Sequence, residues 1–455
     1  MPERYDTIVI GAGPAGEVAV SRLSDAGMRT ALVERELVGG ECAYWACIPS
    51  KTLLRTVEVR AEAERTAGTS APAQSWPEIA AYRDFMVREL DDAGQVAGYR
   101  EQGVEVYKGA GRLAGRGRVE VDGELLEGER IVIATGSRPR VPSIEGLEEA
   151  GYWTNREATT LHELPESVVV LGGGPVGIEL GQFLARMGAR VTLLEAGERL
   201  LAREDPAVSE LLAAQLRADE IEVRFGATVE RVSRDPDPDG ARRVALRGGE
   251  SVSGQELLVA TGREPHLDGL GLGTVGVEPG ARGIAVDKRC RAAEGIWAIG
   301  DVTGVMPFTH VGMYQARVAV ADILGRPARA DYAAIPRVVF CAPEVAAVGL
   351  TEAAAREQGI EVASARLDLA ESLARPWTYE RDPRGQLGLL VDRRRGVLLG
   401  AWAVGPLAGE WIHYAALAIK TATPIEVLRD TVAQFPTYSE GYLKALESLG
   451  PDELA

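Results

Sequence analysis

Two segments of this chain repeat one pattern at the same spacing, and this repeat constrains the fold more than any other feature. Each copy has an apolar strand, a glycine-rich run, a helical stretch and a second strand that ends in an acid. The runs are Gly11-Ala12-Gly13-Pro14-Ala15-Gly16 and Gly172-Gly173-Gly174-Pro175-Val176-Gly177, and Glu34 and Glu195 each lie 23 positions after the first glycine of their copy. This combination is the fingerprint of a dinucleotide-binding fold. We therefore expect an α/β chain with two Rossmann-like dinucleotide-binding domains.

The two copies predict the same chemistry. Glycines let the backbone turn tightly and approach a pyrophosphate, and the helix that follows offers unpaired N–H groups and a positive dipole to that anion. Glu34 and Glu195 are expected to accept hydrogen bonds from a ribose diol. The chain should therefore bind two dinucleotides, one of which can reduce the other.

The composition excludes several classes of protein. The 455 residues carry a formal net charge of −17, which argues against a nucleic-acid partner. No apolar run is long enough to span a bilayer, and no signal peptide precedes the strand expected at Tyr5–Ile10. Four cysteines in a chain of this length do not form a disulfide scaffold. We expect a cytoplasmic protein that binds neither nucleic acid nor membrane.

A cysteine pair, Cys42 and Cys47, follows the first fingerprint, with Pro49 and Lys51 directly after it. Pro49 suits the first turn of a helix, so Cys47 is expected near a helix N-terminus, whose positive end favours a thiolate. A thiolate there can donate charge to an oxidised flavin and attack a disulfide. The alternative is a pair of buried structural cysteines. We expect no metal site, because no second Cys/His pair completes the four ligands of structural zinc.

Further patterns divide the chain. Buried strands are expected at Ile131–Gly136, Leu257–Gly262 and Gly295–Asp301, and residues 54 to 102 read as helical with a break at Gly68–Pro72. The acidic run 235–240 reads as a hairpin tip. After Pro336 the pattern changes to short strands and helices without a fingerprint. The expected parts of the chain are a first nucleotide-binding domain in two segments, 1–148 and 266–333, a second nucleotide-binding domain, 149–265, and a separate α+β C-terminal domain, 334–455.

These motifs, in this order, resemble the pyridine nucleotide–disulfide oxidoreductases, the family of dihydrolipoamide dehydrogenase, glutathione reductase and mercuric reductase. The resemblance implies that the first fingerprint, in 1–148 with 266–333, binds FAD. It implies that the second, in the NAD(P)H-binding domain 149–265, binds NADH, with NADPH as an alternative, and that 334–455 is the dimerisation domain of a homodimer. It implies catalytic roles for Cys47 beside the flavin, Cys42 facing the substrate, Lys51 paired with Glu179, and Glu440. The full set of expected cofactor-binding residues is Gly11, Gly13, Pro14, Ala15, Gly16, Glu34, Arg35, Gly40, Lys51, Ala110, Thr135, Gly136, Asp301, Gly172, Gly174, Val176, Gly177, Glu179, Glu195 and Gly262.

Two departures from the family pattern matter. Disulfide-reducing members carry a catalytic His before a Pro-Thr pair, and here Phe435 holds that position, although the Glu that orients the His is present as Glu440. None of the four histidines of the chain lies in this motif, so the general acid/base that resolves a mixed disulfide is missing. The second departure is Tyr44-Trp45 between the cysteines, where the family has smaller side chains. Trp45 is expected either to cover the disulfide or to pack conventionally.

The sequence leaves the small-molecule electron acceptor open. The leading hypothesis is an NADH-dependent flavoenzyme with an active dithiol. Alternatives are a quinone or dye reductase that uses the flavin directly, a pyridine nucleotide transhydrogenase, and a non-enzymatic redox sensor. Mercuric reductase ranks lower, because the printed sequence ends without a C-terminal cysteine pair and carries Phe435 where that enzyme has Tyr.

Overall fold

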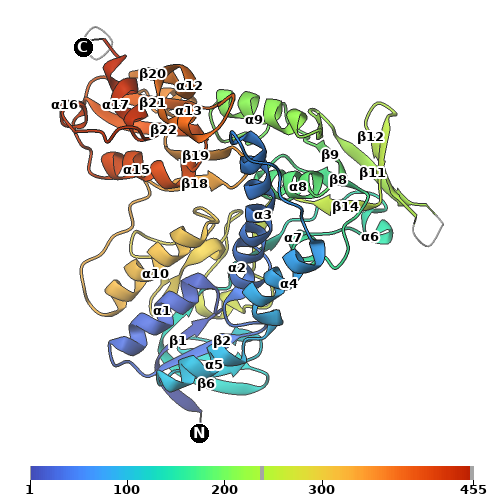
Figure 1. Ribbon diagram of the computed structural model, residues 1–455. Coiled ribbons are helices and arrows are strands. Elements are labelled where there is room, and N and C mark those ends of the chain that lie inside the picture. Colours follow the sequence, from blue (N-terminus) through green and yellow to red (C-terminus); the bar gives the residue numbers. More distant parts are fainter. Residues whose placement is uncertain (1, 236–239, 451–455) are drawn as a thin grey trace. The chain divides into compact units, whose positions relative to one another are not determined.

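In the computed structural model, described for residues 2–235 and 240–450, the chain forms two compact units (Figure 1). The first contains Met1–Ser50, Ala81–Val141 and Gly262–Asp331, and the second contains Lys51–Ala80, Pro142–Thr261 and Tyr332–Ala455. Helices α3 (Cys47–Arg65) and α4 (Trp76–Met86) each begin in one unit and end in the other. The predicted domain boundaries stay predictions, and residues 236–239 of the predicted hairpin tip lie outside the described residues.

The first unit is built on an eight-stranded sheet. Its central strand, β1 (Glu3–Ile10), pairs in parallel with β2 and β6, and its last four residues are buried. Ile8 and Ile10 share a core with Leu113 and Val119 of the same sheet. The other strands are β2 (Thr30–Glu34), β3 (Glu105–Lys108), β4 (Gly111–Leu113), β5 (Arg118–Val121), β6 (Glu124–Ile133), β16 (Arg291–Ala293) and β17 (Ile296–Ala298). A separate pair joins β7 (Ser137–Pro139) to β15 (Arg263–Pro265).

Helices of the first unit follow the predicted pattern. Helix α1 (Pro14–Asp25) starts inside the first glycine run, directly after Gly13, and lies beside α10 (Thr309–Ile323) (Figure 1). The remaining helices are α2 (Gly40–Tyr44), η1 (Arg88–Leu90), α5 (Ala93–Glu101), η2 (Leu272–Val275) and η3 (Gly300–Thr303). The expected strand over Gly295–Asp301 ends earlier, at Ala298, so Asp301 lies in η3.

The second unit contains the repeat of the nucleotide-binding pattern. A parallel sheet runs in the order β10 (Glu222–Arg224), β9 (Arg190–Leu194), β8 (Ser167–Leu171), β14 (Glu256–Val259). Helix α8 (Pro175–Arg186) starts inside the second glycine run, directly after Gly174, as α1 starts inside the first. An antiparallel sheet of β11 (Val229–Arg234), β12 (Arg242–Leu246) and β13 (Ser251–Gly254) adjoins it, with helices α6 (Leu147–Ala150), α7 (Asn155–Thr159) and α9 (Pro206–Ala218). The prediction of two Rossmann-like domains is confirmed.

The change of pattern after Pro336 is confirmed as a five-stranded antiparallel sheet in the order β18 (Pro336–Val339), β19 (Glu344–Gly349), β22 (Val397–Gly405), β21 (Gln386–Asp392), β20 (Val362–Asp368). Leu387 and Ala403 of this sheet share a buried core with Tyr442 and Leu446 of α17. Its helices are α11 (Glu352–Glu357), α12 (Leu369–Ser372), α13 (Arg375–Tyr379), α14 (Ala408–Trp411), α15 (His413–Lys420), α16 (Ile425–Arg429) and α17 (Glu440–Glu447).

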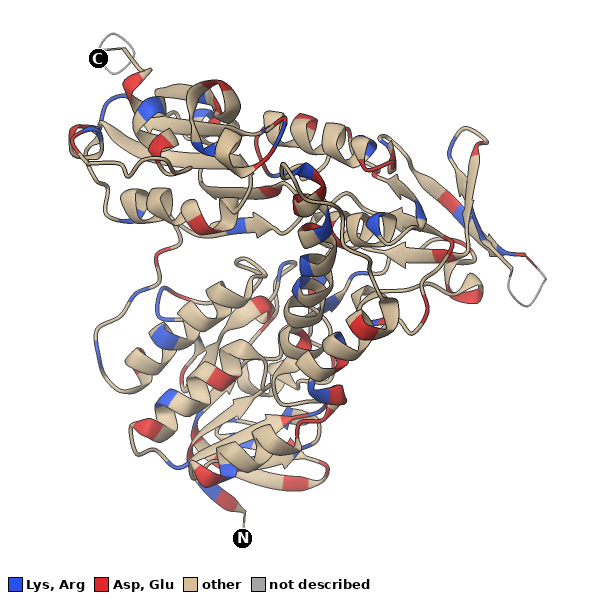
Figure 2. Ribbon diagram, in the orientation of Figure 1, with Lys and Arg blue, Asp and Glu red and all other residues tan. Residues whose placement is uncertain are grey.

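Charged residues of both signs are interspersed along the helices and strands of each unit (Figure 2). None of the described helices is long and apolar enough to cross a membrane.

Candidate active site

The first glycine run forms a tight loop with one open position. Gly11 has a φ of +101°, and a Cβ there would lie 2.4 Å from the carbonyl oxygen of Ala134. A Cβ on Gly16 would lie 1.9 Å from the carbonyl oxygen of Gly11, so these two glycines serve the close packing of strand and helix. A Cβ on Gly13 would meet no atom within 4 Å. The packing of the protein does not require a glycine at Gly13, whereas a pyrophosphate approaching the backbone does.

The second run repeats this geometry in the other unit. A Cβ on Gly172 would lie 2.5 Å from the oxygen of Ala260, and one on Gly177 would lie 2.1 Å from the oxygen of Gly172. Gly174, the counterpart of Gly13, has open space beside it. Each loop therefore has the same cradle at the N-terminus of a helix, which fits a dinucleotide pyrophosphate.

The two fingerprint acids also hold their own loops. Glu34 accepts hydrogen bonds from the N–H groups of Ala12 and Glu36, each at 2.7 Å. Glu195 accepts from the N–H groups of Gly173 at 2.7 Å and Gly197 at 2.6 Å. Burial raises the pKa of Glu34. Because a carboxylate has about four acceptor sites, these bonds leave room for the predicted ribose contact.

The cysteine segment packs directly on the first loop. The N–H of Gly39 donates to the carbonyl oxygen of Ala12 at 2.8 Å. A Cβ on Gly40, the first residue of α2, would lie 2.7 Å from the Cα of Gly13. Only glycine permits this approach, so the segment that carries Cys42 is fixed against the pyrophosphate cradle.

The thiols of Cys42 and Cys47 are both half-buried, and one hydroxyl lies close to each of them. The Oγ1 of Thr309, at the start of α10, lies 3.4 Å from the sulfur of Cys42 and 3.4 Å from that of Cys47. The hydrogen bond to Cys47 raises the pKa of Cys42, and burial adds to the shift. Cys47 is the first residue of α3, which confirms the predicted helix N-terminus. The arrangement favours a Cys42 thiol that keeps its proton, beside a Cys47 at the N-terminal, positive end of a helix.

A polar chain lies after β6 and β17 of the same unit. Ser137 donates to Asp301 at 2.6 Å, and Arg263 donates to the Ser137 hydroxyl at 2.7 Å. Burial raises the pKa of Asp301. Thr135 donates to the carbonyl oxygen of His266 at 2.9 Å.

The remaining expected residues of the first unit lie at the ends of its strands. Arg35 follows β2 and contacts the ring of His266, and Ala110 is exposed between β3 and β4. Gly136 precedes β7, and Gly262 precedes β15.

Lys51 and Glu179 form an ion pair in the second unit. The Nζ of Lys51 lies 2.7 Å from Oε2 of Glu179, which is buried on α8. The other oxygen of Glu179 accepts from the N–H of Phe340 at 2.9 Å, and the ammonium lies 4.7 Å from the centroid of the Phe340 ring. The expected pair is therefore present, and Phe340, which sequence reasoning missed, is its third member.

The C-terminal segment has an unusual set of side chains. Phe435 is 73% exposed, although it is large and apolar. Tyr438 is buried, its ring stacks on Trp411, and burial raises its pKa. Oε2 of Glu440 is buried and has no hydrogen-bond partner within residues 2–235 and 240–450, whereas Oε1 lies 3.4 Å from Lys444.

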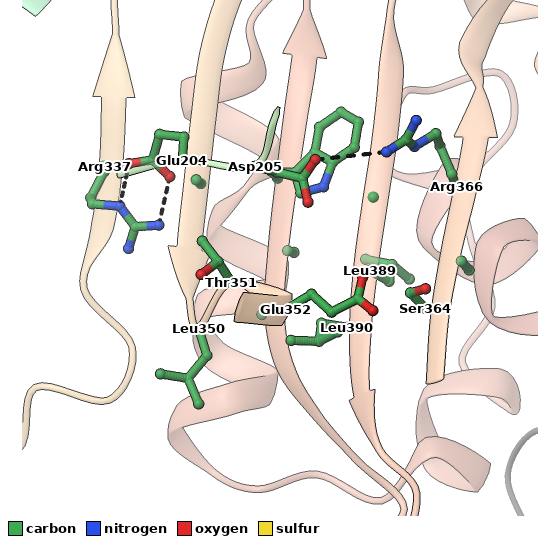
Figure 3. Close-up of a pocket in the computed structure, with 16 residues that line it drawn as sticks. Glu204, Asp205, Arg337, Leu350, Thr351, Glu352, Ser364, Arg366, Leu389 and Leu390 are labelled. Carbon is green, nitrogen blue, oxygen red and sulfur yellow. Dashed lines mark hydrogen bonds and ion pairs between the residues drawn. The ribbon is translucent and has the colours of Figure 1, made fainter. Parts of the chain in front are cut away.

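A separate cavity of about 210 Å³ lies over the five-stranded antiparallel sheet that contains β18 to β22 (Figure 3). Glu204 accepts from Arg337 at 2.7 and 2.8 Å, and Asp205 lies 3.7 Å from Arg366. These charges are paired with one another, and we assign the cavity no part in the redox chemistry.

Comparison with known proteins decides the family. A model described as "Pyridine nucleotide-disulphide oxidoreductase" matches residues 5–321, and the dimerisation domain of that family matches residues 335–446. The chain belongs to the pyridine nucleotide-disulphide oxidoreductase family. It is 34% identical to a mercuric reductase of Bacillus cereus over 456 residues, covering 98% of this chain and 72% of that protein. It is 35% identical to a dihydrolipoyl dehydrogenase of Thermus scotoductus over 455 residues, covering 98% and 97%.

A solved structure is also similar. The Cu(II) complex of the HOCl-induced flavoprotein disulfide reductase RclA from Escherichia coli matches with a TM-score of 0.88 and 28% identity, covering 99% of this chain and all of that one. The chain is thus an FAD-dependent pyridine nucleotide-disulfide oxidoreductase. The family uses FAD and NAD(P)H, and its dimerisation domain implies a homodimer. The prediction of an enzyme of this family is confirmed.

Proposed function

We propose that the protein passes electrons from NADH through FAD to the Cys42–Cys47 pair and on to an acceptor that needs no protein-bound general acid. The observation that carries this proposal is the placement of two thiols around Thr309, on a segment packed against the pyrophosphate cradle at Gly13. Bound FAD supplies a carrier that accepts a hydride and delivers two electrons to a disulfide.

The residues divide the work as follows. Cys47, at the N-terminus of α3, holds the thiolate, and Cys42 faces the acceptor. The raised pKa of Cys42 supports this division, because that thiol holds the shared proton. The Gly11–Gly16 loop, Glu34 and Asp301 bind FAD. As the family resemblance implies, Lys51, paired with Glu179, provides a positive charge for the flavin ring. Glu440 stays in the motif as a hydrogen-bonding group, with Phe435 at the position of the histidine that it orients in other members of the family.

The second nucleotide is NADH. Glu195 would bond the ribose hydroxyls of NADH and would repel a 2′-phosphate. Arg199 is the nearby cation that a 2′-phosphate would need, but it donates to the carbonyl oxygens of Glu204 at 2.7 Å and Ala202 at 2.5 Å. These bonds hold its guanidinium within its own loop.

The acceptor class follows from Phe435. A phenyl ring cannot carry a proton, so cleavage of a substrate disulfide lacks its acid/base group. Quinones and dyes, which take protons from water, fit the site better. A thiol-reactive metal ion is the second candidate, since RclA is described in a Cu(II) complex and this chain is 34% identical to a mercuric reductase. Two Cu(II) ions would take the two electrons of the dithiol, leaving a disulfide, two Cu(I) ions and two protons.

The test is steady-state NADH oxidation by the FAD-loaded protein with lipoamide, glutathione disulfide, a soluble quinone, Cu(II), Hg(II) and thio-NAD. We expect turnover with the quinone or a metal ion and little with the two disulfides. Thio-NAD as the best acceptor would identify a transhydrogenase instead. Absence of turnover with every acceptor would favour the sensor hypothesis.

Cys47→Ser separates the two routes of electron transfer. The reduced native protein should show a long-wavelength absorbance band from the thiolate beside the flavin, and the variant should lack it. Loss of quinone turnover in the variant supports the dithiol route, whereas full turnover shows direct transfer from the flavin. A band that persists in the variant contradicts the assignment of Cys47.

The active form is a homodimer, because the segment from Phe435 to Glu440 serves an active site only when a partner subunit supplies it. Light scattering at assay concentration tests this directly. An active monomer contradicts it.

A further inference from the structure

Tyr44 lies midway between the two cysteines and is completely buried. Its hydroxyl donates to the carbonyl oxygen of Val38 at 3.0 Å, so the last residue of α2 is tied to the segment that leads into the helix. The ring packs against Gly39, where a Cβ would lie 2.9 Å from Tyr44 Cε2. Through these contacts Tyr44 anchors α2, the short helix that carries Cys42.

Val38 is held on its other side as well. Its N–H donates to a carboxylate oxygen of Asp92 at 2.7 Å, and Asp92 also binds Lys108. Both backbone groups of this buried residue are thus fixed, one by Tyr44 and one by Asp92. The connection places the turn before α5 in contact with the cysteine segment.

That turn is strained. Arg88, Glu89 and Leu90 have φ values of 54°, 51° and 58°, so three consecutive residues other than glycine adopt the left-handed conformation. Each one costs backbone energy, because its Cβ approaches the following carbonyl oxygen. Strain of this kind persists only where surrounding contacts enforce it, and such sites often have a functional role.

The turn brings Arg88 onto Tyr44. The guanidinium carbon lies 5.8 Å from the centroid of the Tyr44 ring, within the range of a cation–π contact. These contacts form a closed circuit. Arg88 contacts Tyr44, Tyr44 bonds to Val38, Val38 bonds to Asp92, and the chain leads from Asp92 back to Arg88.

We propose that Tyr44, braced by Arg88, is a positioning residue that holds α2 in the geometry for the Cys42–Cys47 disulfide and so makes this pair more reducing. The inference rests on the proposed redox role of the pair. Gly40 fixes the start of α2 on the loop at Gly13, Cys47 starts α3, and Tyr44 is the internal restraint between them.

The chemistry gives the direction of the effect. In exchange with oxidised dithiothreitol, one cysteine thiolate attacks a reagent sulfur and releases the other reagent sulfur as a thiolate. The second cysteine thiolate then attacks the mixed disulfide, which leaves a protein disulfide and reduced dithiothreitol. Loosening α2 lowers the effective concentration of the second thiol and disfavours the disulfide. The midpoint potential of the pair then rises.

The experiment measures this equilibrium without NADH or an acceptor. The FAD-loaded dimer is equilibrated with dithiothreitol buffers of graded ratio, quenched with acid and alkylated, and mass spectrometry of the Cys42–Cys47 peptide gives the fraction oxidised. We expect Tyr44→Ala to shift the equilibrium about tenfold toward the dithiol, which corresponds to about 30 mV. Arg88→Met should shift it in the same direction, and Tyr44→Phe, which keeps the ring, should shift it less than Tyr44→Ala.

Matched controls remove the same groups elsewhere in the first unit. Tyr107→Phe deletes a hydroxyl that bonds Tyr5, and Arg22→Met deletes a guanidinium on α1, and neither should shift the equilibrium. A shift below threefold in Tyr44→Ala, or one toward the disulfide, overturns the inference. If Tyr44→Ala does not fold, Arg88→Met decides by the same threshold. A native pair that stays reduced in every buffer would instead contradict the proposed function.

Discussion

The hydroxyl of Thr309 lies 3.4 Å from the sulfur of Cys47, although 262 positions separate the two residues in the chain. It lies equally close to Cys42 and lowers the pKa of that thiol, against the larger raising effects of Cys47 and burial. One side chain from α10 therefore contacts both members of the pair and favours ionisation of Cys42.

Thr309→Val should make the dithiol less acidic, because valine keeps the shape of threonine but cannot donate a hydrogen bond. Less thiolate is then present at a given pH, so alkylation should slow about threefold to tenfold near neutrality. The pH profile of the alkylation rate should move to higher pH. Thr274→Val, which removes an exposed hydroxyl of the same unit, is the control. An unchanged profile in Thr309→Val would show that the hydroxyl does not stabilise the thiolate.

NADH should be used at least about tenfold better than NADPH in kcat/KM, because the Glu195 carboxylate repels a 2′-phosphate. Glu195→Gln keeps the size of the side chain and removes its charge. We expect this variant to gain activity with NADPH by roughly tenfold and to change little with NADH. Steady-state kinetics with both nucleotides measure the effect. Comparable kcat/KM values in the native protein would contradict the assignment.

Glu344 should make stability depend on pH near neutrality. Burial raises its pKa to about 7, and the nearby carboxylates of Glu58 and Glu410 add to the shift. A carboxyl with a raised pKa binds its proton more tightly in the folded state. Its stabilising effect is therefore complete below the ordinary pKa of 4.5 and is lost as the pH rises through about 7.

Glu344→Gln removes this titration. The difference in Tm between native protein and variant should grow in favour of the variant between pH 5 and pH 8, by a few degrees. Glu447→Gln, on α17, provides a control with the same chemical change. Parallel Tm curves for native protein and Glu344→Gln across this range would rule out the shift.

The local parts of the fold could be read from the sequence. Short patterns such as Gly13-Pro14 and Pro49 predict these parts. They include the fingerprint strands, the helices that start in the two glycine runs, and the helix start at Cys47. The sequence also predicts that a pyrophosphate approaches Gly13, and this stays a prediction; in the structure a Cβ on Gly13 would meet no atom within 4 Å.

Contacts between distant segments could not be read in this way. Thr309, Phe340 and the left-handed turn at Arg88 carry no local signal, since threonine, phenylalanine and arginine are ordinary residues of helices and strands. Each becomes part of the site only when tertiary packing brings it to Cys47, Lys51 or Tyr44. The hydrogen bonds of Glu34 and Glu195 to their own loops were likewise invisible, because the fingerprint specifies the acid and not its second partner.

The last prediction concerns Phe435. A disulfide exchange needs a group that takes the proton of the attacking thiol and returns one to the leaving thiol, which is typically worth about 10²–10⁴-fold in rate. Phe435→His would restore such a group next to Glu440, whose Oε2 has no hydrogen-bond partner in the part of the chain that the structure describes. That oxygen is an acceptor that can orient an imidazole.

We expect Phe435→His to raise lipoamide reduction by about 10²-fold and quinone reduction by less than threefold, because quinones take their protons from water. Phe435→Leu should leave both rates unchanged, and Phe435→His combined with Glu440→Ala should lose most of the gain. If the native protein already reduces lipoamide as fast as a quinone, a different acid/base group is present. Tyr438 would not fill that role, since it is buried with a raised pKa. If Phe435→His changes neither rate, the site has diverged at more than one residue, and Trp45, beside the thiols, is the next to replace.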